Sequence, residues 1–144
     1  MPRADFRLSH SLRVRWSEVD PQNIVFNPNY LMYFDVAASE YWRALGFTYP
    51  GGFSELGIDT YAVAAKLEFH RSARYDDELE LCARTTRIGR TSLRVALEIH
   101  RGDEHLVSGE LVYVMADPRT QTPVPIPGVL RQAILGYESV PPEQ

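Results

Sequence analysis

The sequence predicts an α+β protein in which a five-stranded antiparallel sheet curves around one long helix. Apolar and polar residues alternate in five separate stretches, which is the period of a strand with one buried face. Between the first and second of these stretches lies a long segment of helical period that has only a narrow polar stripe. Five strands with one apolar face must cover something, and this helix is the one candidate of sufficient size.

The first strand is predicted over residues 6–16, where Phe6, Leu8, Leu12, Val14 and Trp16 share one face. The same alternation recurs in residues 63–69, 79–83, 93–99 and 107–115, whose odd-numbered side chains are mostly apolar. Short glycine-containing turns, IGR at 88–90 and RGDE at 101–104, join the last three and are typical of antiparallel hairpins. We therefore expect an antiparallel meander.

The long helix is predicted over residues 28–45. Asn27 and Pro28 form a typical helix start, because an asparagine side chain can cap a free amide and proline needs no partner for its nitrogen. Gly46 is the matching stop signal. Residues 48–58 should form a loop with at most one helical turn, and a short helix should follow the proline-rich segment 117–128 at residues 129–137.

Length and composition indicate one domain, residues 1–144, with frayed ends at 1–5 and 139–144. A net charge of -4 gives no general attraction for nucleic acid or an anionic membrane surface. The N-terminus lacks a secretory apolar region and no window reaches the length of a membrane span, so we expect a cytoplasmic protein.

The cysteine and the histidines give no sign of a reactive or metal site. Cys82 has no partner for an internal disulfide and falls on the more polar face of its strand, without an activating motif. No metal-ligand spacing is apparent. Four histidines are scattered along the chain without an acid or cysteine at a useful spacing, so we expect surface or rim positions for them: His10, His70, His100 and His105.

The segment SEVDPQNIVFNPNYLMYF, residues 17–34, places a polar elbow between the first strand and the helix. A carboxylate at Asp20 and a helix N-terminus seven residues later can face one cavity, which would bring a negative group close to the positive end of a helix dipole. Taken alone, Asp-Pro is also a common turn and Asn-Pro-Asn a common helix entry, so a purely structural role is the competing interpretation. Glu18 and Asp20 could form a glycosidase-like acid pair, but we expect Glu18 to end the strand at a solvated rim.

Residues 19–39, VDPQNIVFNPNYLMYFDVAAS, closely resemble the signature of hot-dog-fold acyl-CoA thioesterases, most nearly those of the 4-hydroxybenzoyl-CoA thioesterase type. The likeness extends more loosely over AKLEFHRSARYDDELEL and RIGRTSLRV. Asn23 stands where the family usually has glycine, so the loop either holds a left-handed asparagine or takes a different path. Asn27 stands where relatives often carry tyrosine or histidine, but the backbone amide at that place is retained.

The resemblance implies a hot-dog fold and hydrolysis of an acyl-CoA thioester. The backbone amide of Asn27 would hydrogen-bond the thioester oxygen as it gains charge. Asp20 would attack the acyl carbon or activate the water that does so, and the sequence leaves both roles open. Phe26, Tyr30 and Asn23 are the candidate substrate-binding residues. Phe26 and Tyr30 stand close enough to the elbow to touch an acyl group, although aromatic residues on a helix, such as Tyr30, more often serve its packing. No cofactor is expected, since coenzyme A is part of the substrate.

The coenzyme A phosphates need local cations in this acidic chain. The resemblance assigns them to the turn RIGRTS, where Arg87, Arg90 and Thr91 would bind the nucleotide end, often in the site of a neighbouring subunit. The competing interpretation is that these arginines are merely solvated, and Arg71 and Arg74 are a second candidate pair. We expect a homodimer or homotetramer with its sites at the subunit interface, because a five-stranded sheet leaves edges that need a partner.

The sequence leaves two other functions open. One is a hydratase or dehydratase acting on acyl thioesters, which usually needs a histidine with an acid, and the elbow contains no histidine. The other is a non-catalytic module that binds acyl-CoA or an acyl carrier protein.

Overall fold

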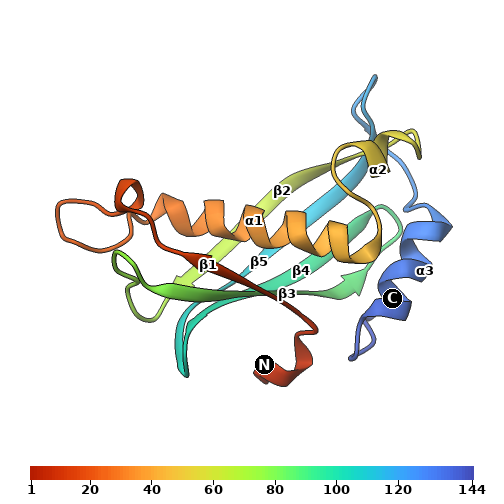
Figure 1. Ribbon diagram of the computed structural model, residues 1–144. Coiled ribbons are helices and arrows are strands. Elements are labelled where there is room, and N and C mark those ends of the chain that lie inside the picture. Colours follow the sequence, from red (N-terminus) through yellow and green to blue (C-terminus); the bar gives the residue numbers. More distant parts are fainter.

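The computed structural model describes residues 1–144 and has the predicted architecture, a curved antiparallel sheet around one long helix (Figure 1). The strands are β1 Leu8–Arg13, β2 Asp59–Phe69, β3 Glu78–Ile88, β4 Ser92–Arg101, β5 Glu104–Asp117 and the short β6 Thr122–Pro123. The helices are α1 Pro28–Leu45, α2 Gly51–Ser54 and α3 Gly128–Tyr137. Two 3₁₀ turns, Arg3–Asp5 and Trp16–Glu18, complete the elements.

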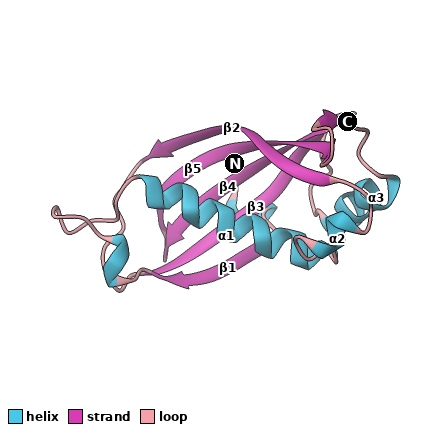
Figure 2. Ribbon diagram, turned by 90° about the horizontal axis from the view of Figure 1, so that it is seen from above, coloured by secondary structure: helices cyan, strands magenta, loops and turns pink.

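The strands lie in the order β1-β3-β4-β5-β2, with β6 paired to β5, and every pairing is antiparallel. The predicted meander is confirmed for β3, β4 and β5. The first two strands take the two edges, because α1 carries the chain across the sheet before β2 begins (Figure 2). This arrangement is the hot-dog fold.

The core lies between α1 and the concave face of the sheet. From α1 it receives Tyr30, Tyr33, Phe34, Ala37, Ala38, Tyr41 and Trp42, which recur at helical spacing and are all buried. From β4 it receives the odd-numbered side chains Leu93, Val95, Leu97 and Ile99. Fully burying a valine, leucine or phenylalanine side chain contributes about 1.5 to 3 kcal/mol, so the packing of α1 against the sheet stabilises the fold.

Gly109 of β5 allows α1 to approach the sheet closely. A Cβ atom at this position would lie 2.5 Å from Cε2 of Phe34 and closer still to the carbonyl oxygen of Lys66. Only glycine fits under the ring of Phe34 without moving the helix.

Glu138, at the end of α3, joins the far end of α1 to β3. Its Oε2 accepts hydrogen bonds from the hydroxyl of Tyr41 at 2.5 Å and from the amide of Thr85 at 2.7 Å. Its other oxygen is buried without a partner. This buried acid closes the end of the core opposite the elbow.

Two sequence expectations are wrong in detail. The first strand runs over Leu8–Arg13 rather than residues 6–16, because Trp16–Glu18 form a 3₁₀ turn instead of continuing beside β3. The C-terminal tail is not frayed: the amide of Glu143 donates to Thr86 at 2.9 Å, and the amide of Ile88 donates to Glu143 at 2.7 Å. None of the helices combines the length and the apolar character needed to cross a membrane.

Candidate active site

The elbow is a narrow hairpin held against the end of the sheet. Val19 and Val25 pair across it, and the amide of Phe26 donates to the carbonyl of Glu18 at 3.0 Å. Val25 is fully buried, and its amide donates to the carbonyl of Ala73 at 2.9 Å. The polar residues of the elbow are therefore fixed in place by a buried anchor rather than carried on a loose loop.

Asn23 adopts the left-handed conformation, with φ at 63°. Asparagine is one of the few residues that tolerates this region. Its amide donates to the carbonyl of Asp20 at 2.9 Å, which closes the turn. Of the two alternatives for this position, the left-handed asparagine is the correct one.

Glu18 is buried, so the expectation of a solvated rim is wrong. Its carboxylate accepts hydrogen bonds from the amide and the guanidinium of Arg15, at 2.9 and 2.7 Å, and from the hydroxyl of Tyr33 at 2.9 Å. Burial acts to raise the pKa of Glu18, but the hydrogen bonds from Arg15 and Tyr33 outweigh it and lower that pKa. Both carboxylate oxygens are occupied, which leaves no free second acid for a glycosidase-like pair.

Asp20 has one restrained and one free carboxylate oxygen. Its Oδ1 accepts the amide of Gln22 at 2.8 Å, while Oδ2 accepts no hydrogen bond from the chain. The side chain is half-buried. A carboxylate held by one oxygen with the other unpaired is oriented and still able to react.

Asn27 precedes the first residue of α1, but its side chain does not cap the helix, contrary to the expectation. The side chain of Asn29 is used instead to tie the helix start to the elbow, donating to the carbonyl of Glu18 at 2.9 Å. The backbone amide of Asn27 donates to no acceptor in the chain. The predicted oxyanion donor is thus unpaired, at the positive end of an 18-residue helix.

The two aromatic candidates differ in position. Phe26 is exposed beside the elbow. Tyr30 is buried: its hydroxyl accepts the amide of Ala73 at 3.0 Å, and its ring packs against Tyr33 and Phe69. Tyr30 therefore serves the core rather than the predicted contact with an acyl group.

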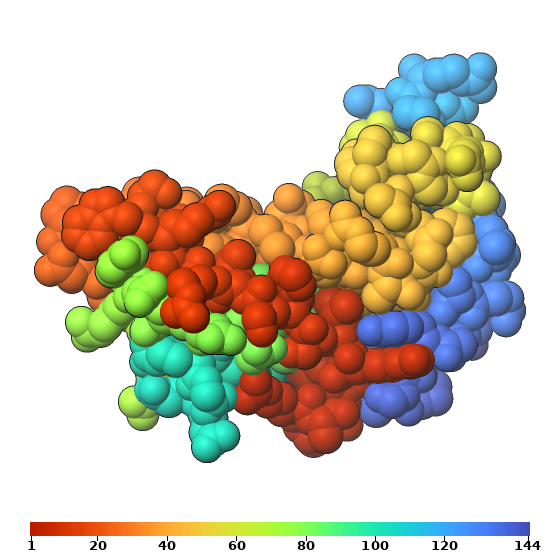
Figure 3. Space-filling model, in the orientation of Figure 1, coloured from red at the N-terminus to blue at the C-terminus, as the bar shows by residue number.

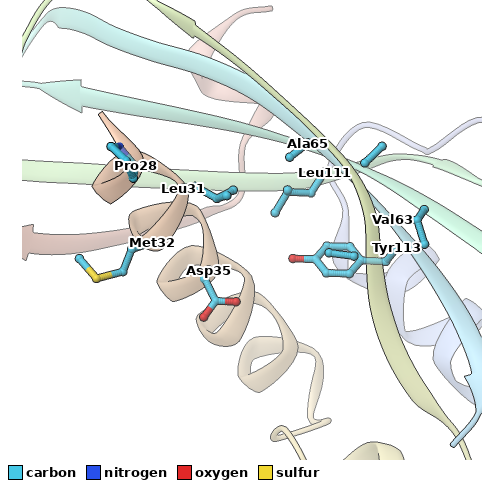
Figure 4. A pocket seen from close by; sticks show the side chains of 10 residues that line it. Pro28, Leu31, Met32, Asp35, Val63, Ala65, Leu111 and Tyr113 are labelled. Carbon is cyan, nitrogen blue, oxygen red and sulfur yellow. The ribbon is translucent and has the colours of Figure 1, made fainter. Parts of the chain in front are cut away.

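A groove of about 660 Å³ runs between α1 and strands β2 and β5 (Figure 4). The space-filling view shows the surface hollowed along α1, between the elbow and the α2 region (Figure 3). Its lining is mostly apolar, with Asp35 as the single charged residue, and comprises Pro28, Leu31, Met32, Asp35, Ala62, Val63, Ala64, Ala65, Leu111 and Tyr113. The groove begins at Pro28, next to the free amide of Asn27, whereas Asp20 is not part of its lining.

The groove was not predicted, although the sequence contains a signal for it. The run Ala62-Val63-Ala64-Ala65 of β2 has small side chains, and β2 is irregular between Ala62 and Ala64. Small residues opposite Leu31 and Met32 of α1 leave space where larger ones would fill the core. Such a signal becomes readable only once the pairing of β2 with the helix is known.

The predicted coenzyme A contacts lie far from the elbow of the same chain. Arg87, Arg90 and Thr91 are at the β3–β4 turn, near α3, whereas the elbow lies beside the start of β3 (Figure 1). The length of β3 separates these two places by about 30 Å. Arg87 also lies 3.5 Å from Glu143 in an exposed ion pair. One chain cannot bring these three residues to its own Asp20.

Arg71 and Arg74, the second cationic candidate, lie on the segment that anchors the elbow through Ala73. Arg71 pairs with Glu104 at 3.5 Å. The guanidinium of Arg74 is exposed and has no acid within ion-pair distance. Within a single chain, this segment is the nearer source of positive charge for the elbow.

The expectation that the histidines occupy isolated surface or rim positions is wrong for His100. It is buried, and its Nε2 lies 2.9 Å from Oε1 of Glu98, two residues earlier on the same face of β4. Cys82 faces away from α1 as expected but is buried, and burial raises the pKa of its thiol. A high thiol pKa disfavours the reactive thiolate.

The enclosed helix, the curved antiparallel sheet and the acid-bearing elbow together define a hot-dog protein. The thioesterase superfamily model matches residues 22–108, and the chain belongs to this family.

Three relatives illustrate the likeness. A curated protein of Aquifex aeolicus named "Putative esterase" is 35% identical over 69 residues, which are 48% of this chain and 53% of that protein. The match thus spans about half the length of that relative. A thioesterase from Thermus thermophilus, solved with coenzyme A and Zn, is 25% identical with a TM-score of 0.82 over 95% of this chain and 98% of that one. A 1,4-dihydroxy-2-naphthoyl-CoA thioesterase from Synechocystis has a TM-score of 0.79 at 16% identity, over 88% and 93% of the chains.

Proposed function

We propose that the protein is an acyl-CoA thioesterase that hydrolyses an acyl- or aroyl-CoA to the free acid and coenzyme A. The observation that carries the proposal is the elbow itself. It holds a carboxylate with one free oxygen, Asp20, and an unpaired amide, Asn27, on a hairpin beside an apolar groove. Membership of the thioesterase superfamily supports thioester chemistry at this place.

In the proposed reaction the amide of Asn27 donates to the thioester carbonyl oxygen. That oxygen gains negative charge as the carbon becomes tetrahedral, so the hydrogen bond strengthens in the transition state, and the dipole of α1 acts in the same direction. Removing one such donor typically raises the barrier by about 3 to 4 kcal/mol.

Asp20 supplies the second half of the chemistry. Either its free oxygen attacks the acyl carbon, expelling the coenzyme A thiolate and leaving an anhydride that water cleaves, or it takes a proton from the water that attacks directly. Both routes yield the free acid and the coenzyme A thiol. Neither requires a cofactor, because coenzyme A belongs to the substrate.

The groove is the proposed site of the acyl group. Leu31, Met32 and Leu111 offer an apolar surface suited to an aromatic ring or a medium fatty chain. Asp35 adds one polar contact in this surface. The groove starts at the residue after Asn27, so an acyl group in it would place its carbonyl near the free amide.

A second copy of the chain is proposed to complete the site. β2 is an edge strand of 11 residues, and its outer side is unpaired. Ala62 to Ala65 are exposed there, beside exposed Leu31 and Met32 of α1. Pairing two β2 edges would cover this apolar surface and close the groove, in a homodimer or in the dimers of a homotetramer. Arg87, Arg90 and Thr91 would then act at the site of another copy.

The test is turnover of an acyl-CoA panel, including benzoyl-, 4-hydroxybenzoyl- and octanoyl-CoA, followed by release of free thiol. Asp20→Asn should lower kcat/KM by roughly 100-fold or more, as expected for loss of a catalytic acid-base group or nucleophile. The fold should persist, because an asparagine Oδ1 still accepts the amide of Gln22. Asp103→Asn, which removes the same charge at an exposed turn, is the matched control.

A second variant separates the backbone role of Asn27 from its side chain. Asn27→Ala keeps the amide, so turnover should stay within a few-fold of the parent. Full activity of Asp20→Asn, or binding of acyl-CoA without thiol release by the parent, would overturn the assignment. Hydration of an enoyl-CoA in place of hydrolysis would favour the hydratase alternative, for which the elbow offers no histidine.

A further inference from the structure

One carboxylate and two imidazoles gather on the face of the sheet opposite α1. Glu98 and His100 are two residues apart on β4, and His105 of β5 lies directly across from His100 in the strand register. Leu97 and Ile99, which alternate with them along β4, point into the core. The three polar side chains therefore share the outer face, away from the elbow hairpin and the groove.

The ligand atoms of these residues lie at metal-binding distances. Nε2 of His100 is 2.9 Å and Nε2 of His105 is 3.9 Å from Oε1 of Glu98, and one ligand atom from each of the three residues falls within 4.8 Å of the others. In a tetrahedral zinc site with bonds near 2.1 Å, neighbouring ligand atoms are about 3.4 Å apart. The two observed separations bracket this value, so small side-chain rotations suffice to enclose an ion.

The cluster contains a buried carboxylate that a cation would stabilise. Glu98 is 7% exposed and His100 is 6% exposed. The only ion-pair partners of Glu98 are His100 and His105, and no lysine or arginine lies within ion-pair distance of its carboxylate. A buried carboxylate without a fixed cation is costly, and a divalent ion would supply the missing charge.

A route to the cluster from solvent is present. A cavity of about 460 Å³ on the outer face is lined by Glu98 and His105 together with Met1, Lys66 and Ser108 among others. His105 is only half-buried. An ion could enter by this cavity and keep a water as its fourth ligand. At the two Nε2 atoms it would take the place of a proton, which His100 now shares with Glu98 and His105 shares with the carbonyl of Val107.

We propose that Glu98, His100 and His105 bind one Zn²⁺ or a chemically similar transition-metal ion per chain. Two imidazoles and one carboxylate suit zinc and its neighbours, whereas magnesium and calcium prefer all-oxygen sites. The site is independent of the proposed thioesterase function, since it lies across the sheet from Asp20. No metal-ligand spacing is visible along the chain, because the third ligand comes from the next strand.

The experiment uses full-length protein without a histidine tag, stripped of metal by a chelator and titrated with zinc chloride in a calorimeter. One ion per chain should bind with micromolar affinity or tighter, and magnesium chloride should produce no binding. Cobalt(II) in place of zinc should give the visible absorption of a four-coordinate site. A stoichiometry other than one, or no binding, overturns the proposal.

Two variants test the ligands. His105→Asn and Glu98→Gln should each weaken zinc binding by roughly tenfold or more. The first alters a half-buried side chain and the second keeps the shape of the buried one, so both should fold, as circular dichroism would verify. His10→Asn is the matched control, because His10 lies on β1 outside the cluster. Equal affinity in His105→Asn and the parent would overturn the ligand assignment.

Discussion

Three acids of this chain show how the immediate surroundings of a side chain decide its use. Asp20 keeps one oxygen free at a half-buried elbow. Glu18 is buried with both oxygens hydrogen-bonded, which lowers its pKa against the effect of burial. Glu138 is buried with one oxygen lacking a partner. Burial raises the pKa of Glu138, and the hydrogen bonds from Tyr41 and Thr85 only partly oppose this.

The raised pKa of Glu138 predicts a pH-dependent loss of stability. The folded state holds this proton more tightly than the unfolded chain, whose ordinary value is 4.5. The contribution of Glu138 to the free energy of unfolding is therefore fully present below that value and is lost as pH rises through the raised folded pKa. Glu138→Gln keeps an acceptor for Tyr41 and Thr85 but cannot ionise, so its free energy of unfolding should not fall in this way. Its melting temperature should gain on the parent as pH increases from mildly acidic to mildly alkaline.

The control is Glu143→Gln, which neutralises an exposed acid in the same region of the fold. Its melting temperature relative to the parent should change little with pH, since exposed ion pairs contribute about 0 to 1 kcal/mol. A difference for Glu138→Gln that stays constant or shrinks with pH would contradict the prediction.

For single residues, the sequence predicts a position correctly when the surroundings of that residue come from neighbours in the chain. Asp20 and the amide of Asn27 belong to one short segment, and the left-handed Asn23 is one of the two alternatives that the sequence allows. The expectation for Glu18 fails because its carboxylate is covered by Tyr33, which lies in the second turn of the following helix α1. The expectation for His100 fails because its acid partner, Glu98, is buried by the fold rather than by the local pattern.

At the scale of elements, the close packing of α1 on β5 depends on Gly109. Gly109→Ala would place a methyl group against the ring of Phe34 and the carbonyl of Lys66. Such overpacking costs about 1 to 3 kcal/mol, so the free energy of unfolding measured in urea should fall by that amount.

Gly136→Ala is the matched control for Gly109→Ala. It makes the same substitution on α3, where an added Cβ meets nothing within 4 Å. In a helix, alanine is favoured over glycine by about 0.5 to 1 kcal/mol, so this variant should be slightly more stable than the parent. Equal stability of Gly109→Ala and the parent would mean that α1 can shift freely over the sheet.

The period of the hydrophobic pattern predicts α1 and all five long strands, because each buries one face and repeats accordingly. The order of the strands is not contained in that pattern. Placing β2 next to β5 depends on the direction in which α1 crosses the sheet, which is a tertiary property. The pairing of Glu143 with β3 escapes prediction for a similar reason, since a short polar tail has no periodic signal of its own.

At the scale of the whole molecule, the proposed dimer rests on the unpaired side of the edge strand β2. Val63→Lys should convert the proposed dimer to a monomer in sedimentation velocity, because two lysines would meet across the symmetric interface. Val129→Lys makes the same change on α3, and the parent valines are 60% and 56% exposed at positions 63 and 129, respectively. This control should remain dimeric. A monomeric parent protein, or a dimeric Val63→Lys variant, would show that β2 is not the interface.

The open side of β2 and the adjacent groove form one surface, so association and turnover would be linked by mass action. Specific activity should then decline on dilution below the dissociation constant of the pair. It should recover with a lag when the enzyme is concentrated again, because the rate of reassembly depends on the collision of two subunits.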